Sequence, residues 1–265
     1  MSTSPRSYLF VPGNRPERFD KALAAGADAV IVDLEDAVPE ADKDRAREQV
    51  RAWLDASRPV VLRINGLQTT WFREDAVLCE HPGVAAVMLP KTECAEDTRP
   101  LRGKPVLALI ETAVGFAAAR SIALAPSVRR LVFGSIDFQL DLDMATTNEE
   151  LLAFRSELAL ASRLAHIERP VDGVCTALDD EEELRSQGLH ARRLGFGAKL
   201  CIHPRQVGAV NECFSPSQER IEWARRVLSA ARAAGSAAVA LDGRMIDRPV
   251  ILQAEQVLRE ARLDD

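Results

Sequence analysis

The sequence predicts an α/β protein built as a (β/α)8 barrel, the TIM-barrel architecture, followed by a C-terminal helical lid or arm. Three observations favour this fold. Short apolar runs recur eight times before residue 214, amphipathic stretches separate them, and several runs are continuously apolar rather than alternating. Continuous runs are typical of parallel strands that helices cover on one side and a packed interior covers on the other. Eight strand-and-helix units in this length fit the size of a barrel.

The predicted strands are the apolar runs themselves, taken in chain order. They are Tyr8–Val11, Ala29–Val32, Val60–Ile64, Val84–Leu89, Val106–Ile110, Leu131–Phe133, Val171–Val174 and Ala198–Ile202. The helices predicted between them include Pro16–Ala25, Glu40–Leu54, Thr112–Ala125, Glu149–His166 and Asp179–Leu194. A doubly wound open sheet is the main alternative, but its first strand usually leads into a glycine-rich nucleotide loop. The segment "FVPGNRPER" lacks the GxGxxG pattern, so the barrel is preferred.

The pattern changes after "IHPRQVGAVNECF". The next stretch, "SPSQERIEWARRVLSAARAAG", has a cap-like serine and a helical period, "AVALDGRMID" is hairpin-like, and "RPVILQAEQVLREAR" opens a helix with Pro249 in its first turn. This tail is not a ninth barrel unit. We therefore predict a catalytic barrel domain over residues 1–213 and a lid, or an arm onto a neighbouring subunit, over residues 214–265.

Composition narrows the classes of protein. The chain has 265 residues, of which 47% are hydrophobic and 28% charged, and a net charge of −6. That balance argues against a general nucleic-acid or membrane-surface binder, although it permits local basic pockets for an anionic ligand. No apolar segment reaches the roughly 18 residues of a transmembrane helix, and "MSTSPRSYLFVPGN" has too short an apolar centre for a signal peptide. We expect a cytoplasmic protein.

Cysteine and histidine give no sign of a disulfide framework or a zinc site. The five cysteines are scattered and never form a CxxC pair, and the four histidines show no metal-ligand spacing. Buried or incidental thiols are the simplest interpretation.

Polar side chains gather where the predicted strands run out into the following loops, which is where barrel enzymes hold their catalytic groups. They are Arg15, Asp33, Glu35, Asp36, Arg63, Asn65, Lys91, Glu111, Asp137 and His203. Two of these carboxylates, Glu111 and Asp137, follow adjacent strands without a histidine or thiolate beside them. Such an oxygen-rich pair suits Mg²⁺, or Mn²⁺, better than zinc.

Each of these residues also has a structural explanation. Glu111 and Asp137 can cap the helices that follow them, and Asp36 can pair with an arginine of a neighbouring strand rather than with a metal. Arg63 interrupts an apolar strand, and a buried guanidinium needs an acidic partner. That partner is either an internal carboxylate or an anionic substrate.

Two lysines are candidates for chemistry. Lys91 in "LPKTE" can form a Schiff base with a carbonyl substrate if it is desolvated, or it can be a member of an ion pair. Several acids nearby keep an amine protonated, which disfavours nucleophilic attack. Lys199 in "GAKLCIHP" precedes the strand end, where a catalytic role is not expected.

Seven motifs carry a resemblance to a known family. In chain order they are "SYLFVPGNRPER", "VIVDLEDAV", "LRING", "MLPKTE", "LIETAVG", "GSIDF" and "CIHPRQV". Together they resemble the citrate lyase beta subunit and HpcH/HpaI aldolase family, in particular its stand-alone acyl-CoA lyases of the malyl-CoA and citramalyl-CoA type. The resemblance covers nearly the whole chain.

The resemblance implies a magnesium-dependent barrel that cleaves, or forms, a carbon–carbon bond in a 3-hydroxyacyl-CoA, giving acetyl-CoA and a 2-oxo acid. It implies Glu111 and Asp137 as metal ligands and Arg63 as the arginine that polarises the substrate. The motif "GRMID" implies that Asp247 is a catalytic aspartate supplied by an adjacent subunit, hence a homo-oligomer with a trimer favoured. The alternative for Asp247 is a turn aspartate before a helix that begins at Pro249.

Further residues are assigned to substrate binding. These are Glu35, Asp36, Lys91 and Arg15, the last on the coenzyme A side, together with Arg63. The stretch "GSIDFQLDLD" departs from the "EDL" of many relatives, with Ile136 in place of an acid. This departure and "GRMID" favour a citramalyl-CoA-like or malyl-CoA-like lyase over a citrate lyase subunit.

Three other functions remain open. A citrate lyase beta subunit would act on a carrier-protein citryl thioester within a multienzyme complex. A pyruvate-type aldolase would need no thioester. A non-catalytic CoA-ester binding protein would keep the barrel without turnover.

Overall fold

The computed structural model describes residues 4–101, 103–145, 149–234, 239–241 and 244–261. Within it the chain forms two compact units, one over Pro5–Asn211 and one that begins at Glu212. Each unit is built from its own hydrophobic core.

The first unit is a closed barrel of eight parallel strands in sequential order. The strands are β1 (Ser7–Pro12), β2 (Ala29–Asp33), β3 (Val60–Arg63), β4 (Val84–Leu89), β5 (Val106–Ile110), β6 (Val128–Phe133), β7 (Glu168–Asp172) and β8 (Ala198–Cys201). The α/β barrel predicted from the apolar runs is therefore confirmed. Its β1–β8 pairing leaves no free edge in the barrel sheet, as closure requires.

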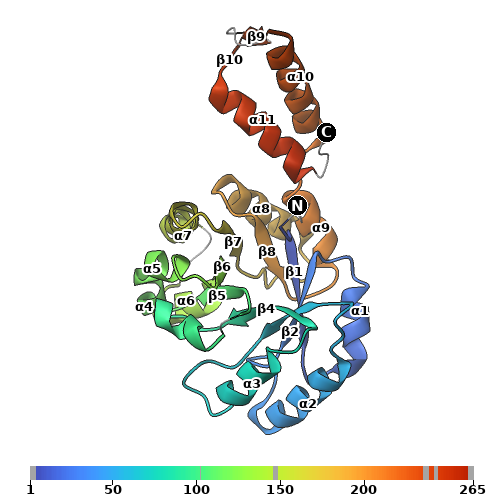
Figure 1. Ribbon diagram of the computed structural model, residues 1–265, viewed down its shortest axis with the longest axis vertical. Coiled ribbons are helices and arrows are strands. Elements are labelled where there is room, and N and C mark those ends of the chain that lie inside the picture. Colours follow the sequence, from blue (N-terminus) through green and yellow to red (C-terminus); the bar gives the residue numbers. More distant parts are fainter. Residues whose placement is uncertain (1–3, 102, 146–148, 235–238, 242–243, 262–265) are drawn as a thin grey trace. The chain divides into compact units, whose positions relative to one another are not determined.

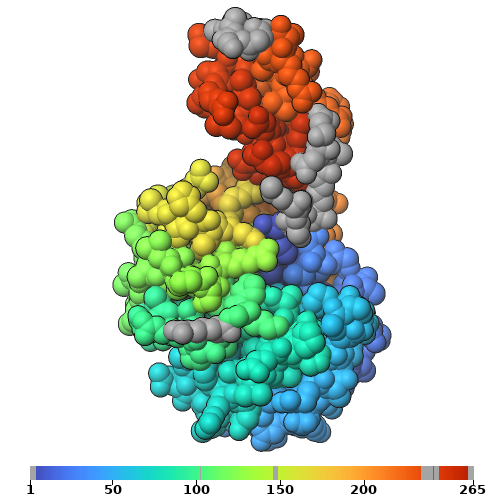
Figure 2. Space-filling view, viewed as in Figure 1, coloured from blue at the N-terminus to red at the C-terminus, as the bar shows by residue number. Residues whose placement is uncertain are grey.

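Helices cover the outside of the barrel (Figure 1). They are η1 (Pro16–Arg18), α1 (Phe19–Leu23), η2 (Glu40–Asp42), α2 (Lys43–Trp53), α3 (Phe72–Leu78), η3 (Ala95–Leu101), α4 (Ala113–Ala117), α5 (Ala119–Ala123), α6 (Ser135–Asp141), α7 (Leu152–Leu164), α8 (Glu181–Arg193) and α9 (Gln206–Cys213). In the space-filling view, the colours from blue to yellow follow one another around the barrel (Figure 2). This order arises because strands that are consecutive in sequence are neighbours in the barrel.

Side chains fill the barrel interior. Successive residues of a strand point to opposite faces, so every second residue faces inward. On β2, β3 and β5 the inward residues of the core include Ile31, Val61 and Leu109. Two residues further on, the same face therefore carries Asp33, Arg63 and Glu111, each at the carboxyl end of its strand. Strand alternation alone thus aims these three charged side chains into the mouth of the barrel.

Several predicted elements differ from the structure. The sixth strand spans Val128–Phe133 rather than Leu131–Phe133. The seventh strand spans Glu168–Asp172 rather than Val171–Val174. This strand begins with the polar residues Glu168 and Arg169, so a search for apolar runs does not detect its start. Glu168 forms an ion pair there with Arg129 of β6. The helix predicted over Thr112–Ala125 is split into α4 and α5 at Ala118, whose φ of −92° and ψ of 0° interrupt the helical backbone.

A group of buried charges lies between the barrel and α7. Asp172 of β7 contacts Lys199 of β8 at 2.7 Å and Arg155 of α7 at 2.8 Å. Asp172 and Lys199 are completely buried. Lys199 is therefore a structural ion-pair partner, in agreement with its position before the strand end.

The second unit is a helical pair with a small two-stranded sheet. Helices α10 (Gln218–Ala234) and α11 (Arg248–Glu260) lie side by side, and β9 (Val239–Leu241) pairs antiparallel with β10 (Arg244–Ile246). The core of this unit is formed by Ala224, Val227, Ile246, Ala254, Val257 and Leu258. The hairpin-like piece and both helices agree with the sequence pattern.

No helix within the described part of the chain is long and apolar enough to cross a membrane.

Candidate active site

A cavity of about 400 Å³ opens at the carboxyl ends of the barrel strands. Its lining residues come from most of the strands. They are Phe10, Pro12, Asp33, Ala37, Arg63, Leu109, Glu111, Phe133, Gly134, Ser135, Ile136, Asp137, Val174, Thr176, Leu200 and Ile202. The structure thus brings Glu111, Asp137 and Arg63 to one cavity, where barrel enzymes carry their chemistry.

Glu111 is fixed on two sides. The backbone N–H of Lys91 donates a hydrogen bond of 2.8 Å to its Oε1 atom. To do so, Lys91 takes a left-handed conformation with φ of 47°, which is uncommon for a residue with a side chain. On the other side lies Gly134, where a Cβ atom would come within 2.6 Å of Glu111 Oε2. Only glycine leaves room for the carboxylate in this position.

The environment of Glu111 disfavours its charge. Its side chain is 3% exposed. Burial raises the pKa of Glu111 to about 8, and the negative charges of Glu35 and Asp137 add to this shift, whereas the Lys91 hydrogen bond and Arg63 oppose it. An ionised Glu111 therefore needs a positive charge that the surrounding side chains do not fully supply.

Arg63 is bound to internal carboxylates. Its Nε and Nη2 atoms donate to the two oxygens of Asp33 at 2.7 and 2.6 Å, and Nη1 lies 2.8 Å from Glu35 Oε2. Its guanidinium also stacks 4.8 Å from the centre of the Phe10 ring. Burial alone would lower the pKa of Arg63, but Asp33 and the other carboxylates outweigh it and raise the pKa above its ordinary value. The structural explanation for Arg63 therefore holds, yet a guanidinium has five N–H groups and these contacts leave donors for a ligand.

Glu35 and its neighbours extend the acidic group. Burial raises the pKa of Glu35 to about 7, with Arg63 opposing the shift and Asp36 and Asp33 adding to it. The Asp36 side chain is 62% exposed and lies 3.6 Å from Arg63. The Lys91 side chain is 59% exposed, and its Nζ atom lies 4.0 Å from Glu35. An ammonium this exposed is not the desolvated amine that a Schiff-base mechanism needs.

Neither Glu111 nor Asp137 caps a helix. The N-cap of α4 is Thr112, whose hydroxyl accepts a hydrogen bond from the Gly115 N–H at 3.0 Å. The N-cap of α6 is Gly134, without a side-chain cap, and Asp137 lies in the first turn of that helix. The carboxylates of Glu111 and Asp137 are therefore not needed for the helix ends.

The residues present fit an oxygen-binding cation. Two carboxylates face one cavity, one of them held in a cradle that a Cβ atom would fill. Among the described residues, no group of three or more His, Cys, Asp or Glu side chains is arranged to hold a metal ion. A site with two carboxylates leaves most coordination positions to water and substrate, which is how Mg²⁺ is commonly bound.

The remaining predicted positions lie outside the cavity lining. Arg15 is paired with Glu17 at 2.7 Å, and the Asn65 side chain donates to Asp75 at 2.6 Å. Asp247 belongs to the second unit and is the N-cap of α11, where its carboxylate accepts from the Val250 N–H at 3.2 Å. The turn-aspartate alternative therefore describes its local structure.

Sequence reasoning missed several lining residues. Ser135 and Thr176 are polar residues of the cavity, and Val174 and Ile202 form part of its apolar wall. The apolar runs place Val174 and Ile202 in strands and indicate no role for them in the site. A signal was present for Gly134, because a glycine between a core strand and an acid marks a close approach of the backbone.

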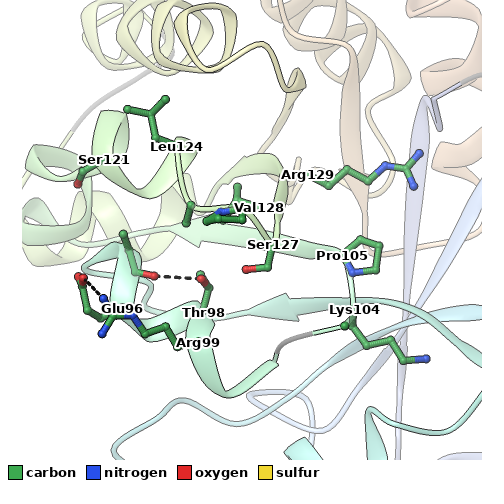
Figure 3. A pocket seen from close by; sticks show the side chains of 14 residues that line it. Glu96, Thr98, Arg99, Lys104, Pro105, Ser121, Leu124, Ser127, Val128 and Arg129 are labelled. Carbon is green, nitrogen blue, oxygen red and sulfur yellow. Dashed lines mark hydrogen bonds and ion pairs between the residues drawn. The ribbon is translucent and has the colours of Figure 1, made fainter.

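A larger cavity, of about 940 Å³, lies on the opposite face, where β5 and β6 begin. Some of its polar groups bind one another or the backbone (Figure 3). Arg99 contacts Glu96 at 2.8 Å, Thr98 donates to the Ala95 carbonyl, and Lys104 donates to two carbonyls at its edge. Because these groups already have partners, the larger cavity has no convergent set of reactive groups among its described lining residues. The smaller cavity is therefore the candidate site.

Fold and site together define a barrel enzyme with paired carboxylates and an arginine at the strand ends. The model of the HpcH/HpaI aldolase/citrate lyase family matches residues 6–204, and the chain belongs to this family. Membership confirms the resemblance drawn from the seven motifs and the expectation of an enzyme from a family of lyases.

Named relatives agree with this assignment. A citrate lyase subunit beta-like protein of Mycobacterium tuberculosis is 39% identical over 96% of this chain and 94% of its own length. A (3S)-malyl-CoA thioesterase of Cereibacter sphaeroides is 34% identical over 97% and 94%. The crystal structure of CitE from Mycobacterium tuberculosis in complex with magnesium, acetoacetate and coenzyme A has a TM-score of 0.87 and 37% identity, covering 98% of this chain and 99% of that one.

Proposed function

We propose that this protein is a Mg²⁺-dependent carbon–carbon lyase that cleaves a 3-hydroxyacyl-CoA of the citramalyl-CoA or malyl-CoA type into acetyl-CoA and a 2-oxo acid. The observation that carries this proposal is the pair Glu111 and Asp137 in one cavity with an excess of negative charge. The similar CitE protein was crystallised with magnesium and coenzyme A, which supports the same ligands here.

Mg²⁺ held by Glu111 and Asp137 would supply a Lewis acid that makes negative charge on a substrate oxygen less costly. Arg63 is rigidly held by Asp33, and its remaining N–H groups bind the substrate carboxylate or thioester oxygen. Glu35 and Asp36 contact Arg63, and Lys91 contacts Glu35. We assign these three residues to substrate binding at the mouth of the cavity. Arg15, in the loop after β1, is assigned to the coenzyme A side.

The cleavage is proton-neutral overall. The 3-hydroxyl releases its proton to solvent as its C–O bond becomes C=O, and the electrons of the breaking C–C bond pass to the thioester as an enolate. The acetyl carbon then takes up one proton. We assign this uptake to Asp247 of a neighbouring subunit, which makes residues 214–265 an arm and requires an oligomer, with a homotrimer favoured. A cytoplasmic location belongs to the same proposal.

Thioester hydrolysis is the second candidate, because a relative of similar identity is named a (3S)-malyl-CoA thioesterase. Hydrolysis releases free coenzyme A and a hydroxy acid, whereas cleavage releases acetyl-CoA and an oxo acid. The products therefore separate the two activities without ambiguity.

The test is a panel of 3-hydroxyacyl-CoA esters with the purified chain, with and without Mg²⁺. The proposal expects acetyl-CoA and a 2-oxo acid in equal amounts, and loss of both after EDTA treatment with recovery on adding Mg²⁺. Free coenzyme A without an oxo acid would establish the thioesterase instead. Activity only with a carrier-protein thioester would indicate a citrate lyase subunit, and activity on simple hydroxy-keto acids an aldolase. Binding without turnover would indicate a CoA-ester binding protein.

Asp247 is tested by separating its two roles. Asp247→Asn keeps an N-cap residue of similar strength but cannot transfer a proton, whereas Asp247→Ala removes both functions. We expect both variants to lose about 10²-fold or more in kcat, and only Asp247→Ala to lose helix stability. Normal kcat in Asp247→Asn would restrict this residue to capping. Trimer mass by light scattering checks the oligomer in both variants.

A further inference from the structure

The cavity mouth is divided into two arcs by strand order. The charged lining residues at or after the ends of β2, β3, β5 and β6 form a polar arc, defined as Asp33, Arg63, Glu111 and Asp137. Phe10 of β1 and Leu200 of β8, with Val174 just after β7 and Ile202 just after β8, form an apolar arc; the lining after β7 also includes the hydroxyl of Thr176. Because β7, β8 and β1 are consecutive in the closed barrel, the apolar arc is continuous.

The apolar arc offers no cation to a ligand. Among the described residues that line the cavity, Arg63 is the one positively charged side chain, and it lies in the polar arc with Asp33 and Glu35 already bound. Arg205 follows the end of β8 but does not line the cavity, and its guanidinium lies 3.0 Å from Asp179. A carboxylate placed against the apolar arc would lose water without gaining a cation in exchange.

Resting on the proposed function, we infer that the apolar arc selects the substituent on the carbon that bears the hydroxyl, and that this substituent is a short alkyl group. That carbon carries four groups. Its hydroxyl and carboxylate belong with the metal ligands and Arg63 in the polar arc, and its thioester arm leads outward to coenzyme A. The fourth group faces the apolar arc, where Leu200 is 3% exposed and Ile202 is 39% exposed.

This assignment names the substrate class. Cleavage would yield a 2-oxo acid with one carboxylate and an alkyl substituent, such as pyruvate or 2-oxobutyrate. Glyoxylate, whose substituent is hydrogen, leaves the arc unfilled. Oxaloacetate, whose substituent is a carboxymethyl group, places a charge against it.

The experiment measures the affinity of 2-oxo acids for the full chain by calorimetry in the presence of Mg²⁺. Oxaloacetate and 4-methyl-2-oxopentanoate form the decisive pair, because they have similar shapes and differ in the charge of the substituent. We expect pyruvate to bind about 10-fold or more tighter than glyoxylate, as one methyl group in an apolar pocket allows. We expect oxaloacetate to bind about 10-fold or more weaker than 4-methyl-2-oxopentanoate.

Ile202→Arg adds a cation to the apolar arc at a partly exposed position. It should raise the affinity for oxaloacetate relative to 4-methyl-2-oxopentanoate by about 10-fold or more. The matched control is Leu140→Arg on α6, because Leu140 is 81% exposed and lies outside the cavity lining. This variant adds the same charge and should leave the order of affinities unchanged.

Tighter binding of oxaloacetate or glyoxylate by the unmodified chain, or no binding by any of the acids, overturns the inference. An equal change in both arginine variants overturns the role of the arc, since it would show a general effect of charge. Acetyl-CoA release from the thioester panel is measured separately and decides the proposed function alone. A chain that shows the expected order of affinities without cleaving any thioester would refute the lyase and retain the apolar arc.

Discussion

Two groups of buried charge in the same barrel are balanced in opposite ways. Between the strands and α7, one acid, Asp172, lies between Lys199 and Arg155. At the cavity mouth, several acids surround the single guanidinium of Arg63, and Glu111 is held there by a backbone N–H. Asp172 in the first group and Asp33, Glu35 and Glu111 in the second are each at most 6% exposed, so burial itself does not distinguish the two groups.

The pKa values show the difference. Burial acts to raise the pKa of Asp172, but Lys199 and Arg155 outweigh it and hold the pKa below its ordinary value. At the mouth, burial and neighbouring acids raise the pKa of Glu111 to about 8. The first group neutralises itself and stabilises the fold, whereas the second leaves negative charge for a ligand to neutralise.

The largest expected effect is on catalysis, from Glu111→Gln. The amide removes a metal ligand and its charge, and we expect a loss of about 10³-fold in kcat, corresponding to several kcal/mol of transition-state stabilisation. Calorimetry should show weaker Mg²⁺ binding. An acid whose pKa is raised by folding costs stability above its unfolded pKa, so the free energy of unfolding should stay equal or rise. A large loss of stability in Glu111→Gln would erase the distinction between the two groups.

The largest expected effect on stability comes from Asp172→Asn. It leaves Lys199 buried without its acid, and breaking a buried pair in this way costs about 3–5 kcal/mol. Urea unfolding of the full chain measures this loss. The folded fraction should still bind Mg²⁺, because Asp172 faces α7 rather than the cavity. Loss of Mg²⁺ binding with unchanged stability would contradict the structural role of this group.

Asp172 also predicts a pH dependence. Folding lowers the pKa of Asp172, so its contribution to stability is complete above the unfolded pKa of about 4 and is lost as the pH falls through the lower folded pKa. The stability of the unmodified chain should therefore fall below about pH 4. The fall should be less steep in Asp172→Asn, which has no such acid to protonate. Parallel acid-unfolding curves for the two proteins would show that other carboxylates cause the transition.

Gly134→Ala has an intermediate effect and tests the cradle around Glu111. The new Cβ atom would meet Glu111 Oε2 at 2.6 Å, so the carboxylate has to move. We expect Mg²⁺ affinity to fall about 10–100-fold, as when the support of a metal ligand is disturbed, with a cost of about 1–3 kcal/mol in stability. Gly208→Ala is the matched control, because a Cβ at Gly208 meets nothing within 4 Å. Equal Mg²⁺ affinity in the two variants would show that Glu111 is not fixed by Gly134.

Much of this arrangement follows from the sequence. Continuous apolar runs predict buried parallel strands, and alternation then predicts that Arg63 and Glu111 face the interior at the strand ends. The polar start of β7 is not predicted, because an ion pair rather than an apolar run marks it. The break at Ala118 is not predicted either, because alanine favours a helix and its sequence neighbours do not signal the change in backbone angles.

The charge balance of each group also requires the structure. Nothing local in the sequence shows that Arg63 takes both oxygens of Asp33, or that Lys199 and Arg155 share Asp172. These partners lie far apart in the chain and meet only when the barrel closes. Composition gives the acids and bases, but only the closed barrel determines which acids keep an unbalanced charge.

The smallest expected effect separates the backbone of Lys91 from its side chain. The structure uses the Lys91 N–H to hold Glu111, while the Nζ atom is exposed and 4.0 Å from Glu35. Lys91→Gly keeps the N–H and suits the φ of 47°, so we expect Mg²⁺ affinity to change less than about 10-fold, below the range for loss of a supporting group. Stability should be equal to or above that of Lys91→Ala, because alanine keeps the strain of this conformation. Trapping of Lys91 by borohydride in the presence of substrate, with turnover that resists EDTA, would instead make its amine the nucleophile and remove the need for a cation beside Glu111.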